Sequence, residues 1–298
     1  YMDCPDRERA QWWGDMVNES GEAFYALSPS AATITEKGIL ELIHWQREDG
    51  TLYSPIPEGN WDKELPGQML ASVGYFGFWN YYLNTGDKET LASVYKGVKR
   101  YLDVWHLKEN GTLVHREGDW YWGDWGRQVD KQLGFNAWYY LALKGYYNMS
   151  ELLGETAEAR QTQEAMTAFK EAFNRVFWDG KGYRTQAYDG AYDDRAQALA
   201  VVSGLAGGDK YDALLEVFKT SYLASPYMEK YVLEALFVME EPEFGLERMK
   251  SRYHKMVDVS PWTTLYENFG DGADRVGHGT NNHAWSGGGL TILAQYVC

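Results

Sequence analysis

The sequence predicts an all-α domain whose helices pair into hairpins and close into a ring, an (α/α)6 toroid. Apolar residues recur at helical spacing almost throughout, for example at Leu91, Val94, Val98 and Leu102. Short and long links alternate between the helices, which is typical of stacked helical hairpins. An open superhelix of helix pairs is the alternative, but the short links recur at no fixed period, which disfavours a regular solenoid.

Eleven helices follow from the apolar spacing. They are expected over residues 11–27, 31–48, 66–84, 87–107, 131–153, 155–177, 193–205, 208–222, 226–239, 242–256 and 282–296. Six hairpins need twelve helices, and the chain begins abruptly, so we expect the twelfth upstream of Tyr1. Residues 1–298 are therefore expected to be one domain excised from a larger protein, with an apolar strip exposed beside the helix at 282–296.

The links between the helices fall into two kinds. Tight turns in which Gly ends a helix, or Asp, Ser or Pro opens the next, are expected at Ser28–Ser30, Thr85–Asp87, Gly154–Glu155, Gly207–Asp209 and Glu241–Pro242. Longer links cover residues 1–10, 49–65, 108–130, 178–192 and 257–281. If the ring closes, all the longer links meet at one end of the domain.

Composition narrows the class of partner. The formal net charge of -15 argues against nucleic acid and against an anionic membrane surface, because both bind clusters of Lys and Arg. Thirteen Trp and 23 Tyr, many of them in polar links, favour stacking on a neutral carbohydrate, although about half of the aromatic residues are expected in the core. Cys4 and Cys298 cannot form a disulfide scaffold, and no metal or phosphate motif occurs, so no metal or cofactor is expected.

Acids and aromatic residues gather in the longer links. The most conspicuous are Asp3, Asp6, Glu8, Asp15, Trp61, Asp62, Trp120, Trp122, Asp124, Trp125, Glu267, Asp271 and Asp274, with His283 just beyond. Any one of the 43 Asp and Glu residues is usually a solvated carboxylate, so the evidence is their coincidence across links. Glycosidic cleavage needs such a convergence, because one carboxylic acid protonates the leaving oxygen and one carboxylate activates water.

The first link carries a family signature. Residues 3–15 read D-C-P-D-R-E-R-A-Q-W-W-G-D. This segment resembles the signature D-C-P-x-R-D-E-R-x-G-W-x-G-D of the bacterial α-L-rhamnosidases, glycoside hydrolase family 78, which are six-hairpin glycosidases. The resemblance implies that Glu8 is the general acid. The chain is one residue short before Glu8, so Asp3 and Arg7 are the nearest counterparts of the family's sugar-binding Asp and Arg, with Asp6 as an alternative.

Further matches extend the resemblance over nearly the whole chain. Residues 263–269, T-T-L-Y-E-N-F, resemble the family's T-T-x-W-E-x-W and imply that Glu267 is the general base. Residues 282–285, N-H-A-W, resemble a motif that makes His283 a sugar-binding residue. Residues 122–125, W-G-D-W, resemble a segment of the cleft wall, which implies substrate contacts from Trp122, Asp124 and Trp125.

The resemblance implies a single catalytic domain that removes terminal α-L-rhamnosyl residues from glycosides or polysaccharides with inversion. Trp12 is expected against the methyl group of rhamnose, with Asp15, Arg7 and His283 binding its hydroxyls. Glu8 has to be protonated, so burial or a neighbouring acid such as Asp3 is expected to raise its pKa. The parent protein is expected to be bacterial and to carry flanking β-sandwich domains, and a periplasmic, secreted or cytoplasmic location stays open.

Three other functions are compatible with a helical ring. A related glycosidase would act on a different deoxy sugar or on a uronic acid. A sugar epimerase or isomerase would use His as acid and base, but only His115, His278 and His283 lie in or beside the longer links. A carbohydrate-binding homologue without catalysis would have lost an acid, whereas Glu8 and Glu267 are both present.

Overall fold

The computed structural model describes residues 2–5, 7–57, 62–270 and 279–298. Within these ranges the chain is helical and forms no β-strand; three isolated bridges, such as Leu107 to Leu113, lie in the longer links. The helices are α1 Trp13–Ala26, α2 Ala32–His44, α3 Pro66–Val73, α4 Asn80–Thr85, α5 Lys88–Asp103, α6 Lys131–Leu153, α7 Thr156–Phe177, α8 Asp194–Ser203, α9 Tyr211–Thr220, α10 Pro226–Val238, α11 Pro242–His254 and α12 Gly288–Tyr296.

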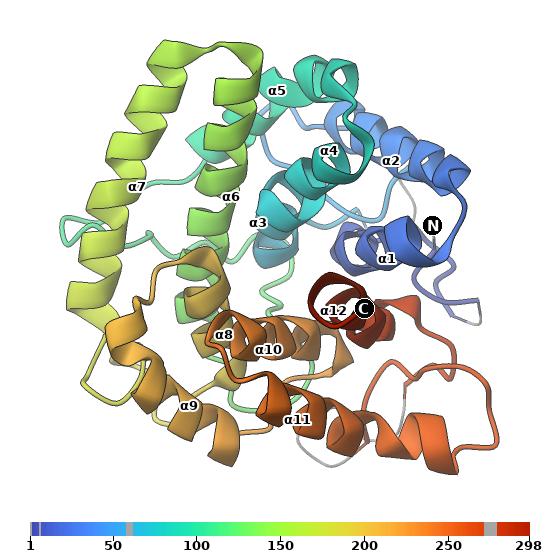
Figure 1. The fold of residues 1–298 in the computed structure, drawn as a ribbon. Helices are drawn as coiled ribbons and strands as arrows, with labels where there is room; N and C mark the ends of the chain where they lie inside the picture. The colour runs from blue at the N-terminus through green and yellow to red at the C-terminus, as the bar shows by residue number, and fades with distance from the viewer. Residues whose placement is uncertain (1, 6, 58–61, 271–278) are drawn as a thin grey trace.

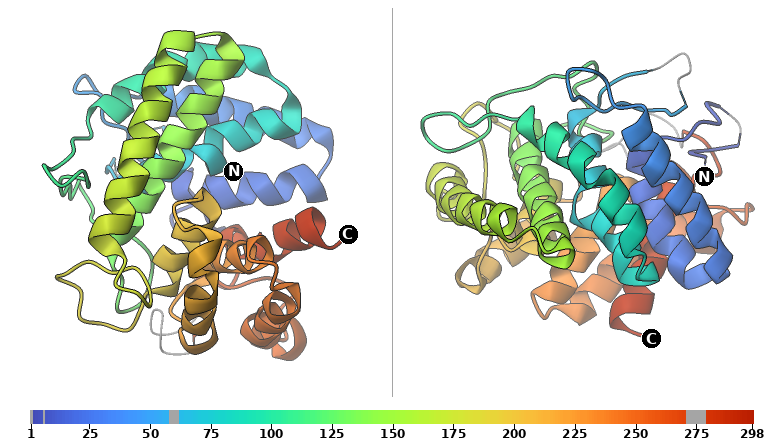
Figure 2. Two further views of the ribbon diagram at one scale, coloured as in Figure 1. Left: turned by 60° about the vertical axis from the view of Figure 1, so that its left-hand side comes forward. Right: turned by 90° about the horizontal axis from the view of Figure 1, so that it is seen from above.

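The helices form a closed ring with an inner and an outer layer. The inner helices α1, α3, α6, α8, α10 and α12 pack in that order, and α12 packs against α1 (Figure 1). The remaining long helices lie outside, and the pair α6 and α7 shows the hairpin arrangement most clearly (Figure 2). The predicted toroid is confirmed, and contact between the first and last inner helices excludes the open superhelix.

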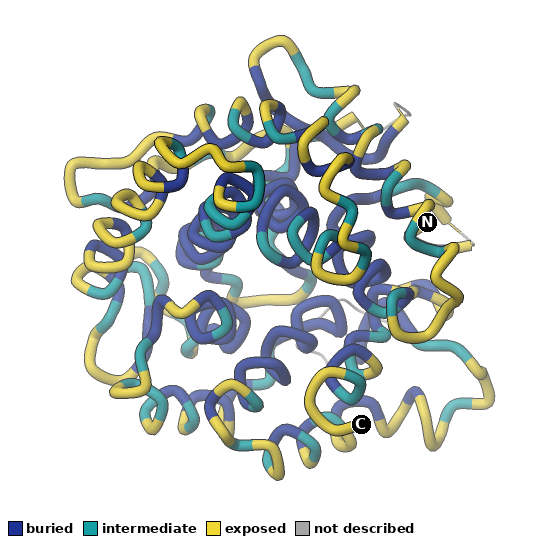
Figure 3. Tube along the Cα trace, turned by 45° about the horizontal axis from the view of Figure 1, so that its top comes forward, coloured by how far each residue is buried: buried dark blue, intermediate teal, exposed yellow. Residues whose placement is uncertain are grey.

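Burial follows the two layers. The inner helices α1, α3, α6, α8 and α10 are buried along most of their length, whereas the outer helices turn one face to solvent (Figure 3). On α10, for example, every residue from Pro226 to Leu236 is buried. Along and just beyond α12, Leu290, Tyr296 and Val297 are 44%, 41% and 48% exposed.

The helix predicted over 66–84 is interrupted. α3 ends at Val73, a π-helical turn covers Tyr75–Trp79, and α4 follows. Gly74 lies against Gly145 of α6, where a Cβ on Gly145 would come within 2.6 Å of the Gly74 carbonyl carbon. The two glycines let the inner helices α3 and α6 approach backbone to backbone, and apolar spacing alone cannot reveal the resulting break.

Most other helix ends lie within a few residues of the prediction. Gly86 and Gly154 end α4 and α6 in the left-handed conformation, with φ of 69° and 79°, as expected for helix-ending glycines. α8 ends at Ser203, two residues before the predicted end at 205, and Gly204 follows it in the left-handed conformation. The expected helices at 31–48 and 87–107 end early, at His44 and Asp103, and the last helix starts only at Gly288 after a 3₁₀ turn over Ala284–Gly287.

A buried ion cluster joins three helices below the longer links. Arg248 of α11 is 1% exposed and binds Asp194 of α8 at 2.7 Å and Glu229 of α10 at 2.6 Å. The same guanidinium donates to the carbonyl oxygens of Phe218 and Ser221. A buried guanidinium with this many acceptors fixes the relative positions of α8, α10 and α11, because losing any partner leaves a charge uncompensated.

Glu22 of α1 is another acid with an inaccessible carboxylate oxygen. Its negative charge has much weaker compensation from neighbouring groups than the charges in the ion cluster. Its Oε1 atom is inaccessible and accepts no hydrogen bond from the described residues, although the residue as a whole is only partly buried. Burial raises the pKa of Glu22 to about 8, and the charge of Lys230 on α10 opposes this shift only partly. The folded protein therefore keeps a proton on Glu22 near neutral pH.

The proton on Glu22 should make the free energy of unfolding depend on pH. The unfolded chain releases it near pH 4.5 and the folded chain near pH 8, so Glu22 lowers the free energy of unfolding as the pH rises between these values. Glu22→Gln cannot ionise, so this variant should gain stability relative to the wild type between about pH 5 and about pH 8. Urea denaturation at both pH values measures the difference.

Glu164→Gln on the exposed face of α7 is the matched control and should change stability equally at both pH values. A Glu22→Gln variant whose stability relative to the wild type is independent of pH would contradict a protonated Glu22 in the folded state.

Candidate active site

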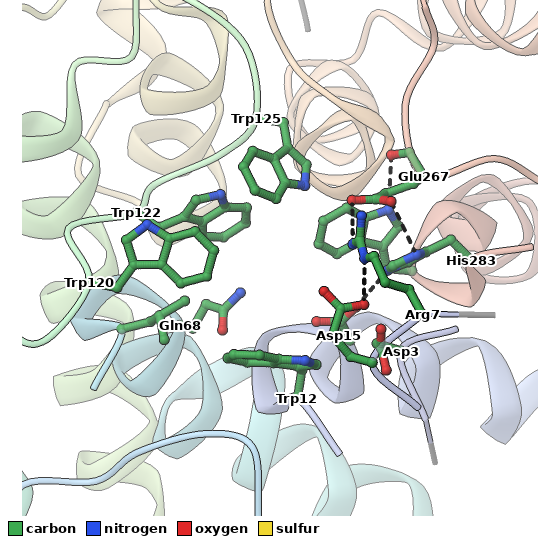
Figure 4. A pocket seen from close by; sticks show the side chains of 13 residues that line it. Asp3, Arg7, Trp12, Asp15, Gln68, Trp120, Trp122, Trp125, Glu267 and His283 are labelled. Carbon is green, nitrogen blue, oxygen red and sulfur yellow. Dashed lines mark hydrogen bonds and ion pairs between the residues drawn. The ribbon is translucent and has the colours of Figure 1, made fainter. Parts of the chain in front are cut away.

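A pocket lies where the longer links meet at one end of the ring (Figure 4). The empty space within it, including the part open to solvent, is about 360 Å³. The residues that line it are Asp3, Arg7, Glu8, Trp12, Asp15, Leu65, Gln68, Trp120, Trp122, Trp125, Glu267, His283 and Trp285. Nine of the ten residues predicted from the sequence are in this set, and only Asp124 is not.

The first link is folded back on itself before α1 begins. The Asp3 carboxylate accepts from the Ala10 backbone N–H at 2.8 Å, and the Asp3 N–H donates to the Ala10 carbonyl oxygen at 3.0 Å. This closed loop presents Arg7 and Glu8 to the pocket. Trp12 then caps α1, and Asp15 follows in its first turn, so one short segment supplies five of the lining residues.

Arg7 bridges the two glutamates that the sequence predicts as acid and base. Its Nε lies 2.7 Å from Glu8 Oε2, and its Nη2 lies 3.1 Å from Glu267 Oε1. Burial by itself would raise the pKa of Glu8, but hydrogen bonds from Arg7 and Asp3 and the charge of Arg7 outweigh it, so the pKa lies below its ordinary value. The expected upward shift of the Glu8 pKa is thus wrong, because the contacts with Arg7 and Asp3 together outweigh the effect of burial.

The acid of this link whose pKa is raised is Asp3. Burial raises the pKa of Asp3 to about 6, and its contacts with Glu8 and Asp15 add to the effect. The Cys4 thiol lies between the two carboxylates, 2.9 Å from Asp3 Oδ2 and 3.6 Å from Glu8 Oε2. Potential ligand atoms of Asp3, Cys4 and Glu8 lie within 4.8 Å of one another, but hydrogen bonds to Ala10 and Arg7 already occupy these carboxylates, so we assign no metal.

Glu267 is fully buried and held in one orientation. Its Oε2 accepts from the Thr280 backbone N–H at 2.9 Å, while its Oε1 faces Arg7. Gly279 has a φ of 66°, and a Cβ at this position would lie 2.8 Å from the Glu267 carboxyl carbon. The turn before Thr280 therefore needs glycine both for its backbone conformation and for room beside the carboxylate.

His283 connects Glu267 to α1. Its Nε2 is 2.8 Å from Asp15 Oδ1, its Nδ1 is 2.7 Å from Thr280 Oγ1, and Nδ1 lies 3.9 Å from Glu267 Oε2. Burial would lower the pKa of His283, but the hydrogen bond and charge of Asp15 raise it above the ordinary value. The cation thus favoured lies between two acids, and the chain from Asp15 through His283 joins both ends of the sequence.

Five tryptophans line the pocket. Trp120 lies edge-on to Trp12 with ring centroids 6.4 Å apart, and 6.0 Å from Trp125. Trp122 stacks on Trp285 at 6.2 Å, and Trp285 lies beside His283, with ring centroids 4.4 Å apart. Trp285 was not predicted as a site residue although it belongs to the motif of His283. Gln68 gave no signal because it lies within the apolar pattern of the helix expected over 66–84, and Leu65 gave none because an apolar residue at the end of a link carries no chemistry.

Asp124 does not line the pocket, in contrast to its two predicted neighbours. Its carboxylate accepts from the Ser225 hydroxyl and backbone N–H, and Arg195 lies 3.4 Å away. Both oxygens are thus used to fasten the link at 108–130 to the start of α10. Among the other acids and aromatic residues singled out in the sequence, Asp6, Trp61, Asp271 and Asp274 lie outside the described residues.

Comparison with known families agrees with the sequence signature. The model of the bacterial alpha-L-rhamnosidase 6 hairpin glycosidase domain matches residues 1–297. The chain belongs to this family. The resemblance inferred from the motifs is therefore confirmed, and with it the enzyme class, since the family is one of glycoside hydrolases. Among the residues described, no helix of this rhamnosidase-family domain has the length and apolar character that a membrane span requires.

Solved structures show the same fold. A family 78 rhamnosidase of Bacillus sp. GL1 superposes with a TM-score of 0.82 at 21% identity, covering 98% of this chain and 32% of that one. The Streptomyces avermitilis alpha-L-rhamnosidase complexed with L-rhamnose gives 0.80 at 20% identity, covering 98% and 29%. The alpha-L-rhamnosidase from Aspergillus terreus gives 0.77 at 19% identity, covering 99% and 36%.

This rhamnosidase-family domain thus spans about a third of each of these three solved chains. No curated protein matches its sequence.

Trp12 provides a test of the aromatic wall. Trp12→Ala is expected to weaken binding of L-rhamnose by roughly 1 to 3 kcal/mol, the scale of an apolar group in a pocket. Because the indole is only 7% exposed, the variant should also be less stable, so calorimetric titration is done well below its melting temperature. Trp178→Ala, outside the pocket, is the control and should bind L-rhamnose as the wild type does. Equal affinities of the Trp12 variant and the wild type would remove Trp12 from the binding site.

Proposed function

We propose that the domain hydrolyses terminal α-L-rhamnosyl residues from glycosides or polysaccharides with inversion, Glu8 acting as general acid and Glu267 as general base. The observation that carries this proposal is the pocket itself. Two glutamates from opposite ends of the chain face one guanidinium there, beside a wall of tryptophans. In an inverting reaction the base activates a water that attacks from the face opposite the leaving group.

Glu267 suits the role of base because its carboxylate is oriented from several sides. The Thr280 backbone N–H and Arg7 occupy one oxygen each, and the indole of Trp285 donates to the Glu267 carbonyl oxygen at 3.1 Å. A base held by this many contacts loses little entropy when it takes the proton of the attacking water.

Glu8 has to gain a proton before it can act as acid. We propose that the sugar draws Arg7 away from Glu8 by offering its hydroxyls to the guanidinium. Without this partner the pKa of Glu8 rises, because burial is then the dominant influence. Asp3 is the nearest source of the proton, since its carboxyl lies beside Glu8 and burial raises its pKa to about 6.

L-Rhamnose fits the two sides of the pocket. Its methyl group needs an apolar surface, which Trp12 supplies, and its hydroxyls need charged or polar partners, which Asp15, Arg7 and His283 supply. The Streptomyces avermitilis enzyme of the same fold was solved with L-rhamnose. We further propose that residues 1–298 form the catalytic domain of a larger protein, whose β-sandwich domains flank it.

One observation favours a second function, that of a carbohydrate-binding homologue without catalysis. The ion pair with Arg7 keeps Glu8 ionised in the unliganded site, and an ionised Glu8 cannot protonate a leaving group. Activity of the full-length protein on an aryl α-L-rhamnoside, with the α-L-fucoside and β-glucuronide as alternatives, distinguishes the two functions and the sugar class.

The stereochemical course tests the mechanism. Proton NMR of early time points should show the product with the opposite anomeric configuration to the substrate, before mutarotation. Glu267→Gln keeps the shape of the side chain and removes the base, so kcat should fall by roughly 100-fold to 10,000-fold. Glu164→Gln is the control and should keep wild-type kcat. A first product that retains the configuration of the substrate would exclude the inverting scheme.

The leaving group tests Glu8. An activated aryl leaving group departs with little protonation, so Glu8→Gln should lower kcat/KM much more for glycosides of poor leaving groups than for an activated aryl rhamnoside. The measurement is a series of aryl rhamnosides with leaving groups of increasing pKa. An equal loss across the series would mean that Glu8 is not the proton donor.

A further inference from the structure

Gln68 is a polar side chain in the aromatic half of the pocket that neither the sequence motifs nor the proposed mechanism uses. It lies in the first turn of α3 and is 4% exposed. Figure 4 shows its carboxamide pointing into the pocket, across from Arg7 and Glu267. Its Oε1 atom is inaccessible in the unliganded site and accepts no hydrogen bond from any described residue.

A buried carbonyl oxygen without a donor destabilises a protein, so such groups are rare unless a ligand supplies the donor. The side chain of Gln68 is also restrained. A Cβ on Gly14 of α1 would lie 2.6 Å from Gln68 Cγ, so the side chain fills the space that this glycine leaves. Gly14 therefore allows Gln68 to extend into the pocket, and packing against α1 holds it there.

The surroundings of Gln68 indicate what kind of donor it meets. Trp12, Leu65 and Trp120 line the same side of the pocket, whereas the ionisable groups lie across from it. An uncharged carboxamide offers one acceptor and two donors, which matches a sugar hydroxyl. A pyranose whose C1 lies between the two catalytic glutamates directs its C4, the position across the ring, towards the opposite wall.

We propose that Gln68 is a specificity-determining residue that binds the C4 hydroxyl of the sugar, its carboxamide turning on binding so that Oε1 accepts the hydroxyl proton. The inference rests on the proposed function, because it takes the position of C1 from the roles of Glu8 and Glu267. It goes beyond that function by assigning the recognition of C4 to an uncharged residue on the aromatic wall.

The test combines a substrate that lacks the C4 hydroxyl with an enzyme variant that lacks the Gln68 carboxamide. kcat/KM is measured in the full-length protein for an aryl α-L-rhamnoside and for its 4-deoxy analogue. The wild type should prefer the parent substrate by about tenfold or more, because the analogue leaves Oε1 without a donor. Gln68→Met has similar length and no hydrogen bond, so it should lose about tenfold on the parent and little on the analogue.

Three controls make the result specific. The 3-deoxy analogue should lose the same factor as the parent when Gln68 becomes Met, because its C4 hydroxyl is intact. Gln68→Glu keeps an acceptor oxygen at the same place and should retain part of the discrimination at C4. Gln163→Met on the exposed face of α7 should leave both rates unchanged.

The outcomes separate this inference from the proposed function. A wild type that cleaves the parent and the 4-deoxy analogue equally well overturns the role of Gln68, whatever the variants do. So does a Gln68→Met variant that loses equally on both substrates, since this is the behaviour of a residue that only packs. A wild type that cleaves no α-L-rhamnoside at all instead refutes the proposed function.

Discussion

Closure of the helix ring between α1 and the segment 283–288 is the contact on which the site depends. Asn18 of α1 is fully buried and donates to the carbonyl oxygens of Tyr227 and Trp285, while the Tyr231 hydroxyl donates to its side-chain oxygen. One turn earlier, Asp15 binds His283. The first helix is thus fastened by adjacent polar contacts to α10 and to the segment before α12, and these contacts bring the segments of Glu8 and Glu267 face to face.

The same closure concentrates negative charge. Asp3, Glu8, Asp15 and Glu267 all line one pocket in a chain of net charge -15, and burial raises the pKa of Asp3 and of Asp15. Arg7 and His283 are the cations that offset this charge, and each contacts two acids. The protonation states of these acids and cations are therefore coupled to one another. A substrate that moves one cation changes the protonation of the neighbouring acids.

The sequence was sufficient for the ring and for most of the pocket, and the reasons differ. Apolar spacing predicted the helices, and the alternation of short and long links predicted their closure into a ring. The motifs around Glu8 and Glu267 predicted side chains that the fold brings into one pocket. Asp124 was misplaced because its motif marks the pocket wall as a segment, in which Trp122 and Trp125 face inward while Asp124 anchors the link. Gln68 and the π-helical turn at Tyr75–Trp79 depend on contacts between helices, which no local pattern encodes.

Glycines explain how such a crowded pocket stays open. Gly14 leaves the space that the Gln68 side chain occupies, and Gly279 leaves the space beside the Glu267 carboxylate. In both places a methyl group would meet a functional side chain, not merely the packed core. Since interiors are packed to crystal density, room for a polar side chain in a chosen orientation has to be provided by a neighbour that lacks a side chain. The position of a glycine beside the pocket is therefore information about the residue it accommodates, and at Gly14 that residue is the one the motifs did not reveal.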